Sequence, residues 1–202
     1  VPVEDIEGNV AQAKRCEAAG CQILRVTCPS AADAKCIEAV KNAVNIPIVA
    51  DIHFVPEVAA IAAKYVDKVR INPGNYNSSH GEFEALIDRC RERGVAIRIG
   101  VNHGSLSKRV FDEWGDTPEG MVASAMEFLR VCREKAFDQV VVSMKSSNTR
   151  VMVAAYRLLA EAMEREGMDY PLHLGVTEAG NGIEGRIKSA VGIGALLADG
   201  IG

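Results

Sequence analysis

The stretch DKVRINPGNYN, residues 67–77, decides the fold because it joins a strand to a turn and places a cation inside the strand. The apolar run around Arg70 is typical of a buried strand in a parallel sheet. Pro73 and Gly74 are turn formers that end it. A guanidinium is costly to bury unless an anion meets it. Arg70 therefore indicates either a neighbouring carboxylate or a bound anionic ligand.

Strand-like runs of this kind recur along the chain. The predicted strands are 21–27, 46–52, 67–72, 95–102, 138–145 and 171–177. Segments with helical spacing surround them, at 4–19, 31–43, 56–65, 81–93, 118–135, 150–166 and 185–199. Strict alternation of strands and helices predicts a parallel sheet. No linker or low-complexity tract interrupts it, so the sequence predicts one α/β domain over residues 1–202.

The alternation begins and ends on a helix, which favours a TIM-type (β/α)8 barrel whose first and eighth strands are not in this chain. We expect the first strand before Val1 and the eighth after Gly202, since a complete barrel takes about 250 residues. A doubly wound sheet is the competing architecture, because GNGIEG at 180–185 matches G-x-G-x-x-G. That fingerprint is incomplete, since the acidic residue about 20 positions later should end a strand, and Asp199 ends a helix. In a barrel these glycines belong to the usual phosphate-binding loops.

Composition narrows the class of protein. The 202 residues are 48% hydrophobic and 25% charged, with a net charge of −4, which is typical of a globular domain and does not indicate binding to nucleic acid or to an anionic membrane. The sequence has neither a long apolar run nor the layout of a signal peptide. The cysteines form no C-x-x-C pair, which predicts reduced thiols in a reducing compartment. They are Cys16, Cys21, Cys28, Cys36, Cys90 and Cys132.

Polar residues stand at the carboxyl end of every predicted strand, where barrel chemistry gathers. They are Arg25 and Thr27, Asp51 and His53, Arg70, Asn72 and Asn75, Arg98, Asn102 and His103, Ser143, Lys145 and Ser147, and His173, Thr177 and Glu178. Residues two apart on a strand share a face. Four cations at one barrel mouth would repel each other unless a polyanion filled it, and guanidinium groups suit phosphate. The pattern predicts a diphosphate ligand.

Structural explanations stand beside this prediction. Any single arginine could instead pair with Asp51 or Glu178. Asn72 could serve only the turn around Pro73. Lys145 could form a Schiff base with a phosphorylated sugar, as in a class I aldolase.

Several strings resemble the 4-hydroxy-3-methylbut-2-en-1-yl diphosphate synthases, iron–sulfur enzymes of the non-mevalonate isoprenoid pathway. They are RVT, VADIHF, KVRINPGN, IRIGVNHGSL, SMKSS, YPLHLGVTEAG and GRIKSAVGIGALLADGIG. The resemblance follows chain order over essentially all residues. It implies a TIM barrel that holds 2-C-methyl-D-erythritol 2,4-cyclodiphosphate by its diphosphate, for reductive ring opening and dehydration to the linear allylic diphosphate. A pterin-binding barrel like dihydropteroate synthase and a ligand-binding module without catalysis are two competing interpretations of the same residues.

The resemblance also implies roles for single residues. The diphosphate ligands are Arg25, His53, Arg70, Arg98, Asn102 and Lys145, with Asp51 and Asn72 beside them. Glu178 faces the reacting carbons as the catalytic residue. A 4Fe–4S cluster is held by a separate C-terminal domain outside this chain, so no metal ligand is expected among these residues, and this fragment alone is expected to be inactive. The resemblance further implies a ferredoxin or flavodoxin as electron donor, a homodimer, and a cytoplasmic or, in plants, plastid location. The approach to strand 171–177 resembles versions with an inserted extra domain.

Overall fold

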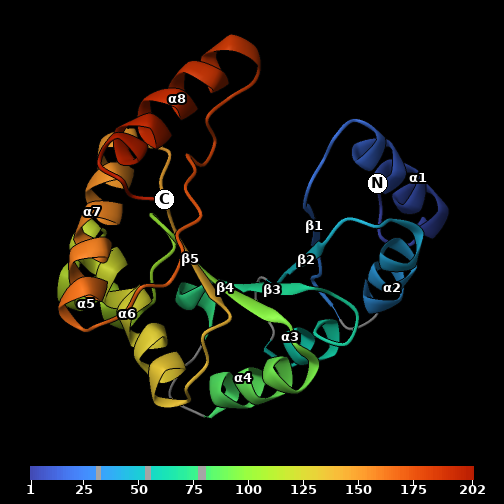
Figure 1. The fold of residues 1–202 in the computed structure, drawn as a ribbon, viewed down its shortest axis with the longest axis horizontal. Coiled ribbons are helices and arrows are strands. Elements are labelled where there is room, and N and C mark those ends of the chain that lie inside the picture. Colours follow the sequence, from blue (N-terminus) through green and yellow to red (C-terminus); the bar gives the residue numbers. More distant parts are fainter. Residues whose placement is uncertain (31–32, 53–55, 77–80) are drawn as a thin grey trace. The chain divides into compact units, whose positions relative to one another are not determined.

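The structure is a computed structural model that describes residues 1–30, 33–52, 56–76 and 81–202. The chain divides into two compact units. The first consists of Val1–Ile71 and Ser79–Ile97, and the second of Asn72–Ser78 and Arg98–Gly202. Figure 1 colours the chain from blue to red and labels the elements of both units.

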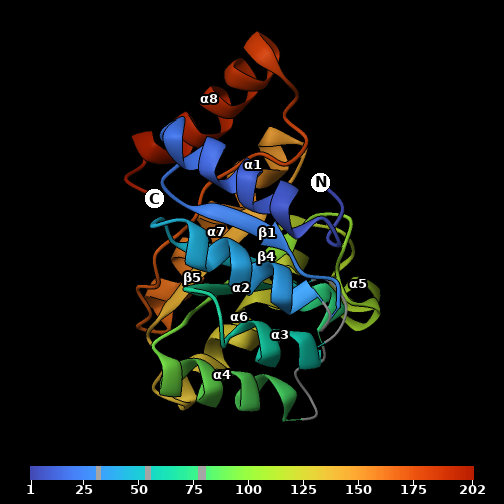
Figure 2. The same cartoon turned by 90° about the vertical axis from the view of Figure 1, so that its right-hand side faces the viewer.

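The first unit contains three neighbouring parallel strands, β1 (Leu24–Thr27), β2 (Ile48–Asp51) and β3 (Lys68–Ile71). Its helices are α1 (Ile6–Ala18), α2 (Ala34–Ala43), α3 (Pro56–Ala62) and α4 (Glu82–Arg93). Figure 2 shows these four helices stacked in chain order beside the strands. β2 is buried along its whole length, whereas β1 alternates between half-buried and exposed residues. The register places Asp51 opposite both Thr27 and Arg70, so the polar strand ends lie in one row.

The second unit is built on two neighbouring strands, β4 (Ala96–Asn102), which enters it at Arg98, and β5 (Val140–Lys145). Its helices are η2 (Pro73–Asn75), α5 (Lys108–Trp114), α6 (Pro118–Glu134), α7 (Thr149–Arg165) and α8 (Gly182–Ala198). Helix α7 packs against both α6 and α8. The strand order follows the chain order within each unit.

The strand predicted at 171–177 is wrong in extent. Only Leu172 forms a bridge, to Val142 of β5, supported by a hydrogen bond from the His173 N–H to the Val142 carbonyl at 2.8 Å. Its far edge meets no strand in the part of the chain that the structure describes. Further along, Gly175 lies against the Lys145 side chain, since a Cβ at position 175 would stand 3.0 Å from Lys145 Nζ. The segment therefore runs beside β5 without a continuous ladder.

Helix α5 is not predicted by the sequence pattern, because a seven-residue helix is too short to show apolar periodicity. A signal does exist in its N-cap. Ser107 accepts a hydrogen bond from the Val110 N–H at 3.4 Å, the usual arrangement for a serine at that position. No helix of the described residues is both long and apolar enough to cross a bilayer.

Tyr156 of α7 anchors the segment that follows this helix along the chain. The side chain is fully buried, and its hydroxyl donates a hydrogen bond to the His173 carbonyl at 2.5 Å. Burial raises the pKa of Tyr156 above its usual range, while the nearby Arg98 charge opposes the rise. The phenol therefore stays a hydrogen-bond donor at all physiological pH values.

We expect Tyr156→Phe to lower the free energy of unfolding by about 1–3 kcal/mol, because the His173 carbonyl loses this donor. Urea denaturation of the protein, with circular dichroism as the signal, measures this loss. Tyr65 is the matched control, since it is only half-buried in the structure, and Tyr65→Phe should leave the midpoint nearly unchanged. Equal midpoints for Tyr156→Phe and wild type would contradict the anchoring role.

Candidate functional site

The candidate site residues of the first unit form one charged cluster around Asp51. Asp51 Oδ1 lies 2.9 Å from Arg70 Nη1, and Asp51 Oδ2 lies 3.4 Å from Arg25 Nε. The Asp51 and Arg70 side chains are only 5% and 6% exposed, whereas Arg25 is 53% exposed. Register explains the contact, because β2 and β3 place Asp51 and Arg70 side by side. Two guanidinium groups share one carboxylate, so the three side chains together carry a net positive charge that Arg25 presents to solvent.

The anion that the sequence predicts for Arg70 is therefore present within the protein as Asp51. This pairing relieves the cost of burying Arg70 and does not remove its ability to bind a phosphate, because a guanidinium carries five N–H donors. His53, the remaining candidate of this unit, lies outside the described residues.

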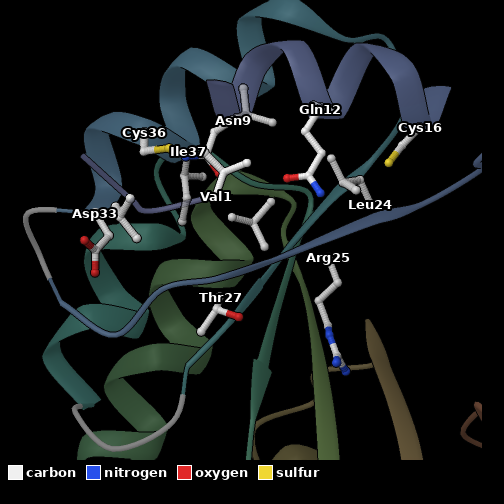
Figure 3. Close-up of a pocket in the computed structure, with 14 residues that line it drawn as sticks. Val1, Asn9, Gln12, Cys16, Leu24, Arg25, Thr27, Asp33, Cys36 and Ile37 are labelled. Carbon is white, nitrogen blue, oxygen red and sulfur yellow. The ribbon is translucent and has the colours of Figure 1, made fainter. Parts of the chain in front are cut away.

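A cavity of about 250 Å³ also lies in the first unit, between the N-terminal segment, α1, α2 and β1. Figure 3 shows Gln12 and Cys16 on the α1 side of it, while the Arg25 side chain runs from β1 away from them. At the other end Asp33 is occupied, since its Oδ2 accepts hydrogen bonds from the Ser30 N–H at 2.7 Å and hydroxyl at 2.9 Å. One arginine and a buried carboxylate do not make this cavity a site for a polyanion.

In the second unit, three candidates stand on the paired strands. Arg98 and Asn102 share a face of β4, and Arg98 is buried at 5% exposure. Lys145 ends β5, and its carbonyl accepts a hydrogen bond from the His103 N–H at 2.9 Å. The Lys145 side chain occupies space that glycine leaves free at position 175. Two cations and an amide thus lie on neighbouring strands, toward their carboxyl ends, as the sequence predicts.

Asn72 has a structural task that the sequence pattern does not separate from ligand binding. Its Oδ1 accepts from the Gly74 N–H at 3.1 Å, which shapes the turn of η2, and its Nδ2 donates to Ser105 Oγ at 2.9 Å. The residue is 5% exposed. Both ends of the amide are engaged with protein groups, so Asn72 joins two loops.

Glu178 lies in the loop between the Leu172 bridge and α8, and it is exposed. Its φ is +52°, a left-handed conformation that costs a residue with a side chain of order 1 kcal/mol. The preceding residue is anchored by a hydrogen bond from the Thr177 N–H to the Ser146 carbonyl at 3.2 Å. Within the described ranges, no ion pair or hydrogen bond joins the Glu178 carboxylate to another side chain. A strained, accessible carboxylate is a reasonable candidate for chemistry.

The family model for the GcpE TIM-barrel domain matches residues 1–202. The chain belongs to the GcpE family. This assignment confirms the predicted barrel class and excludes the doubly wound sheet, so GNGIEG is a barrel loop and not a dinucleotide fingerprint.

Curated relatives of this GcpE chain are named 4-hydroxy-3-methylbut-2-en-1-yl diphosphate synthase. A flavodoxin-type protein from Parabacteroides distasonis is 53% identical over 100% of the chain and 37% of its own length. One from Leptospira interrogans is 49% identical over 98% of the chain and 34% of its own length. A ferredoxin-type protein from Picosynechococcus is 49% identical over 98% of the chain and 55% of its own length. The chain thus spans about a third to a half of these relatives.

The cysteines of this GcpE chain do not fit an iron–sulfur cluster. Burial raises the pKa of the Cys28 thiol to about 11 and those of Cys90 and Cys132 to about 12, so these groups stay protonated at neutral pH. Cluster ligands are thiolates. Across the described ranges, no group of three or more metal-ligating side chains comes together.

Proposed function

We propose that this GcpE chain is the substrate-binding barrel of a 4-hydroxy-3-methylbut-2-en-1-yl diphosphate synthase. The observation that carries the proposal is identity of 49–53% over essentially the whole chain to proteins of that name. The charged residues support it. Arg25 and Arg70 in the first unit, and Arg98 and Lys145 in the second, are suited to the diphosphate of 2-C-methyl-D-erythritol 2,4-cyclodiphosphate. Asn102 adds a neutral amide donor, and His53 is a further proposed ligand.

The proposed reaction takes up two electrons and two protons. The C–O bond between the sugar carbon and the diphosphate breaks, the C3 oxygen leaves as water, and the linear allylic diphosphate forms. The electrons come from a flavodoxin or a ferredoxin, in line with the relatives' names, by way of parts of the protein outside this chain, and the protein acts as a homodimer.

This chain's own contribution is electrostatic and positional. The leaving diphosphate gains charge as its bond to carbon breaks, and fixed cations stabilise that charge without reorganising at the moment of reaction. Asp51 holds Arg70 in place while leaving Arg25 exposed. Glu178 is proposed to deliver the proton to the departing C3 oxygen.

Purified full-length protein, loaded with its cluster and supplied with a chemical reductant, tests the proposal directly. Incubation with the cyclodiphosphate should yield the linear allylic diphosphate, identified by ³¹P NMR, in which two phosphorus signals change from the cyclic to the linear pattern. Binding of the cyclodiphosphate without any product would reduce the protein to a ligand-binding module. No binding at all would overturn the assignment of substrate.

Arg98→Ala in the full-length protein is expected to weaken binding of the cyclodiphosphate by about 1.5–3 kcal/mol, the usual range for a charge-assisted hydrogen bond. Isothermal titration calorimetry measures the change. Arg93→Ala is the matched control, because Arg93 is an exposed arginine in the last turn of α4. Equal affinity of both variants and wild type would make Arg98 a structural residue only.

A further inference from the structure

The turn that follows β4, residues 102–105, is held from several sides within the second unit, and we call it the β4-exit turn. A hydrogen bond from the Ser105 N–H to the Asn102 carbonyl at 3.1 Å closes it, and Gly104 has a φ of +82° that glycine adopts without strain. The His103 N–H ties the turn to β5 through the Lys145 carbonyl at 2.9 Å. Asn102, a proposed diphosphate ligand, is the first residue of this turn.

The first anchor of the β4-exit turn comes from η2. Asn72 Nδ2 donates to Ser105 Oγ at 2.9 Å. The backbones also touch, because a Cβ at Gly74 would lie 1.7 Å from the Ser105 carbonyl oxygen. η2 itself is fixed on α6, where the Tyr76 ring packs edge-on against Phe128 with centroids 6.4 Å apart. One side of the turn therefore rests on a buried, closely packed support.

The second anchor is Asp116, which lies between the end of α5 and the start of α6. Its Oδ1 accepts a hydrogen bond from the Gly104 N–H at 3.0 Å, and its Oδ2 lies 3.5 Å from His103 Nε2. The same ring nitrogen lies 3.2 Å from the Asp116 carbonyl, which can only accept, so Nε2 carries the proton. The His103 side chain is thus committed to Asp116, and one aspartate contacts both central residues of the turn.

We propose, on the basis of the function proposed above, that Asp116 is a positioning residue that sets the β4-exit turn and through it the amide of Asn102 for the diphosphate. The support around Asp116 is closely packed. Thr117 caps α6 by accepting from the Gly120 N–H at 3.1 Å, and Gly120 lets that first turn approach the Gly115 carbonyl, which a Cβ would meet at 2.6 Å. A carboxylate held this way transmits the position of α6 to the turn.

Calorimetry with the cyclodiphosphate on the full-length protein tests this role. Asp116→Ala should weaken binding about tenfold, because two hydrogen bonds to the turn are lost. Asp116→Asn should recover most of the affinity, since its amide oxygen still accepts from the Gly104 N–H. His103→Phe, which removes the ring nitrogens, should weaken binding about threefold and serves as a second variant should Asp116→Ala not fold. Asp112→Ala, at an exposed acid of α5, is the control with unchanged affinity.

A double-mutant cycle with Asn102→Ala separates positioning from general stability. If Asp116 acts through Asn102, the double variant should bind no more weakly than Asn102→Ala alone. Additive losses, or a lower melting temperature of Asp116→Ala with unchanged affinity, would overturn the positioning role while leaving the proposed function intact. Failure of the wild-type protein to bind the cyclodiphosphate would overturn both.

Discussion

Glu178→Gln in the full-length, cluster-loaded protein is expected to lower turnover at least about a hundredfold while substrate affinity and melting temperature stay near wild type. Glutamine keeps the size and the hydrogen-bonding oxygen of the side chain but has no acidic proton to give. General acid catalysis contributes about 10²–10⁴ in rate, so its loss should appear in kcat and not in KM. Steady-state kinetics with the cyclodiphosphate measures both constants.

The surroundings of Glu178 supply the controls. Glu184→Gln, at an exposed carboxylate in the first turn of α8, should leave turnover unchanged. Glu178→Gly should lose turnover as Glu178→Gln does, yet gain stability, because glycine adopts a φ of +52° without strain. Should Glu178→Gln retain full turnover, or should it unfold the protein, the catalytic assignment is wrong and Glu178 is a structural residue.

Arg70→Met is expected to cost about 3–5 kcal/mol of unfolding free energy, because it leaves the buried Asp51 carboxylate without its closer arginine. Arg25 still faces Asp51 at 3.4 Å, which favours the lower end of that range. Chemical denaturation of the protein measures the loss. A weaker affinity of Arg70→Met for substrate would by itself mix lost stability with lost binding.

The double variant Arg70→Met with Asp51→Val separates these effects. Replacing both members of a buried ion pair by apolar residues is often neutral for stability, so much of the loss should be recovered. Binding of the cyclodiphosphate should still be weaker by about tenfold or more, since the guanidinium that we propose as a ligand is absent. Normal affinity in the stabilised double variant would show that Arg70 serves Asp51 and not the substrate.

The row of charges was predictable because strand parity and chain order follow from short-range pattern. Arg70 beside Asp51 is what parallel strands in chain order allow. Whether the partner of Arg70 is a carboxylate or a ligand was not predictable, because it depends on register to within one residue. The loss of the ladder at 171–177 accompanies the packing of Lys145 against Gly175, which is a tertiary contact.

Single-residue roles were harder to predict than elements. Asn72 is equally typical of a turn and of a ligand set, and only its bonds to Gly74 and Ser105 reveal the structural task. Asp116 carries no sequence signal, because it sits between two helices and meets residues twelve and thirteen positions earlier. The left-handed φ of Glu178 is equally silent, since glutamate seldom adopts it.

The buried cysteines give each unit of the barrel its own reporter of breathing motions. Cys90 lies in α4 of the first unit and Cys132 in α6 of the second, and both have no exposed surface. A thiol-specific reagent can reach either one only after its helix detaches, so the labelling rate under native conditions gives the free energy of that local opening. Mass spectrometry of the labelled peptides would read the two rates from one sample. Equal rates would mean that both units open in one cooperative event, and unequal rates would mean that each opens by itself.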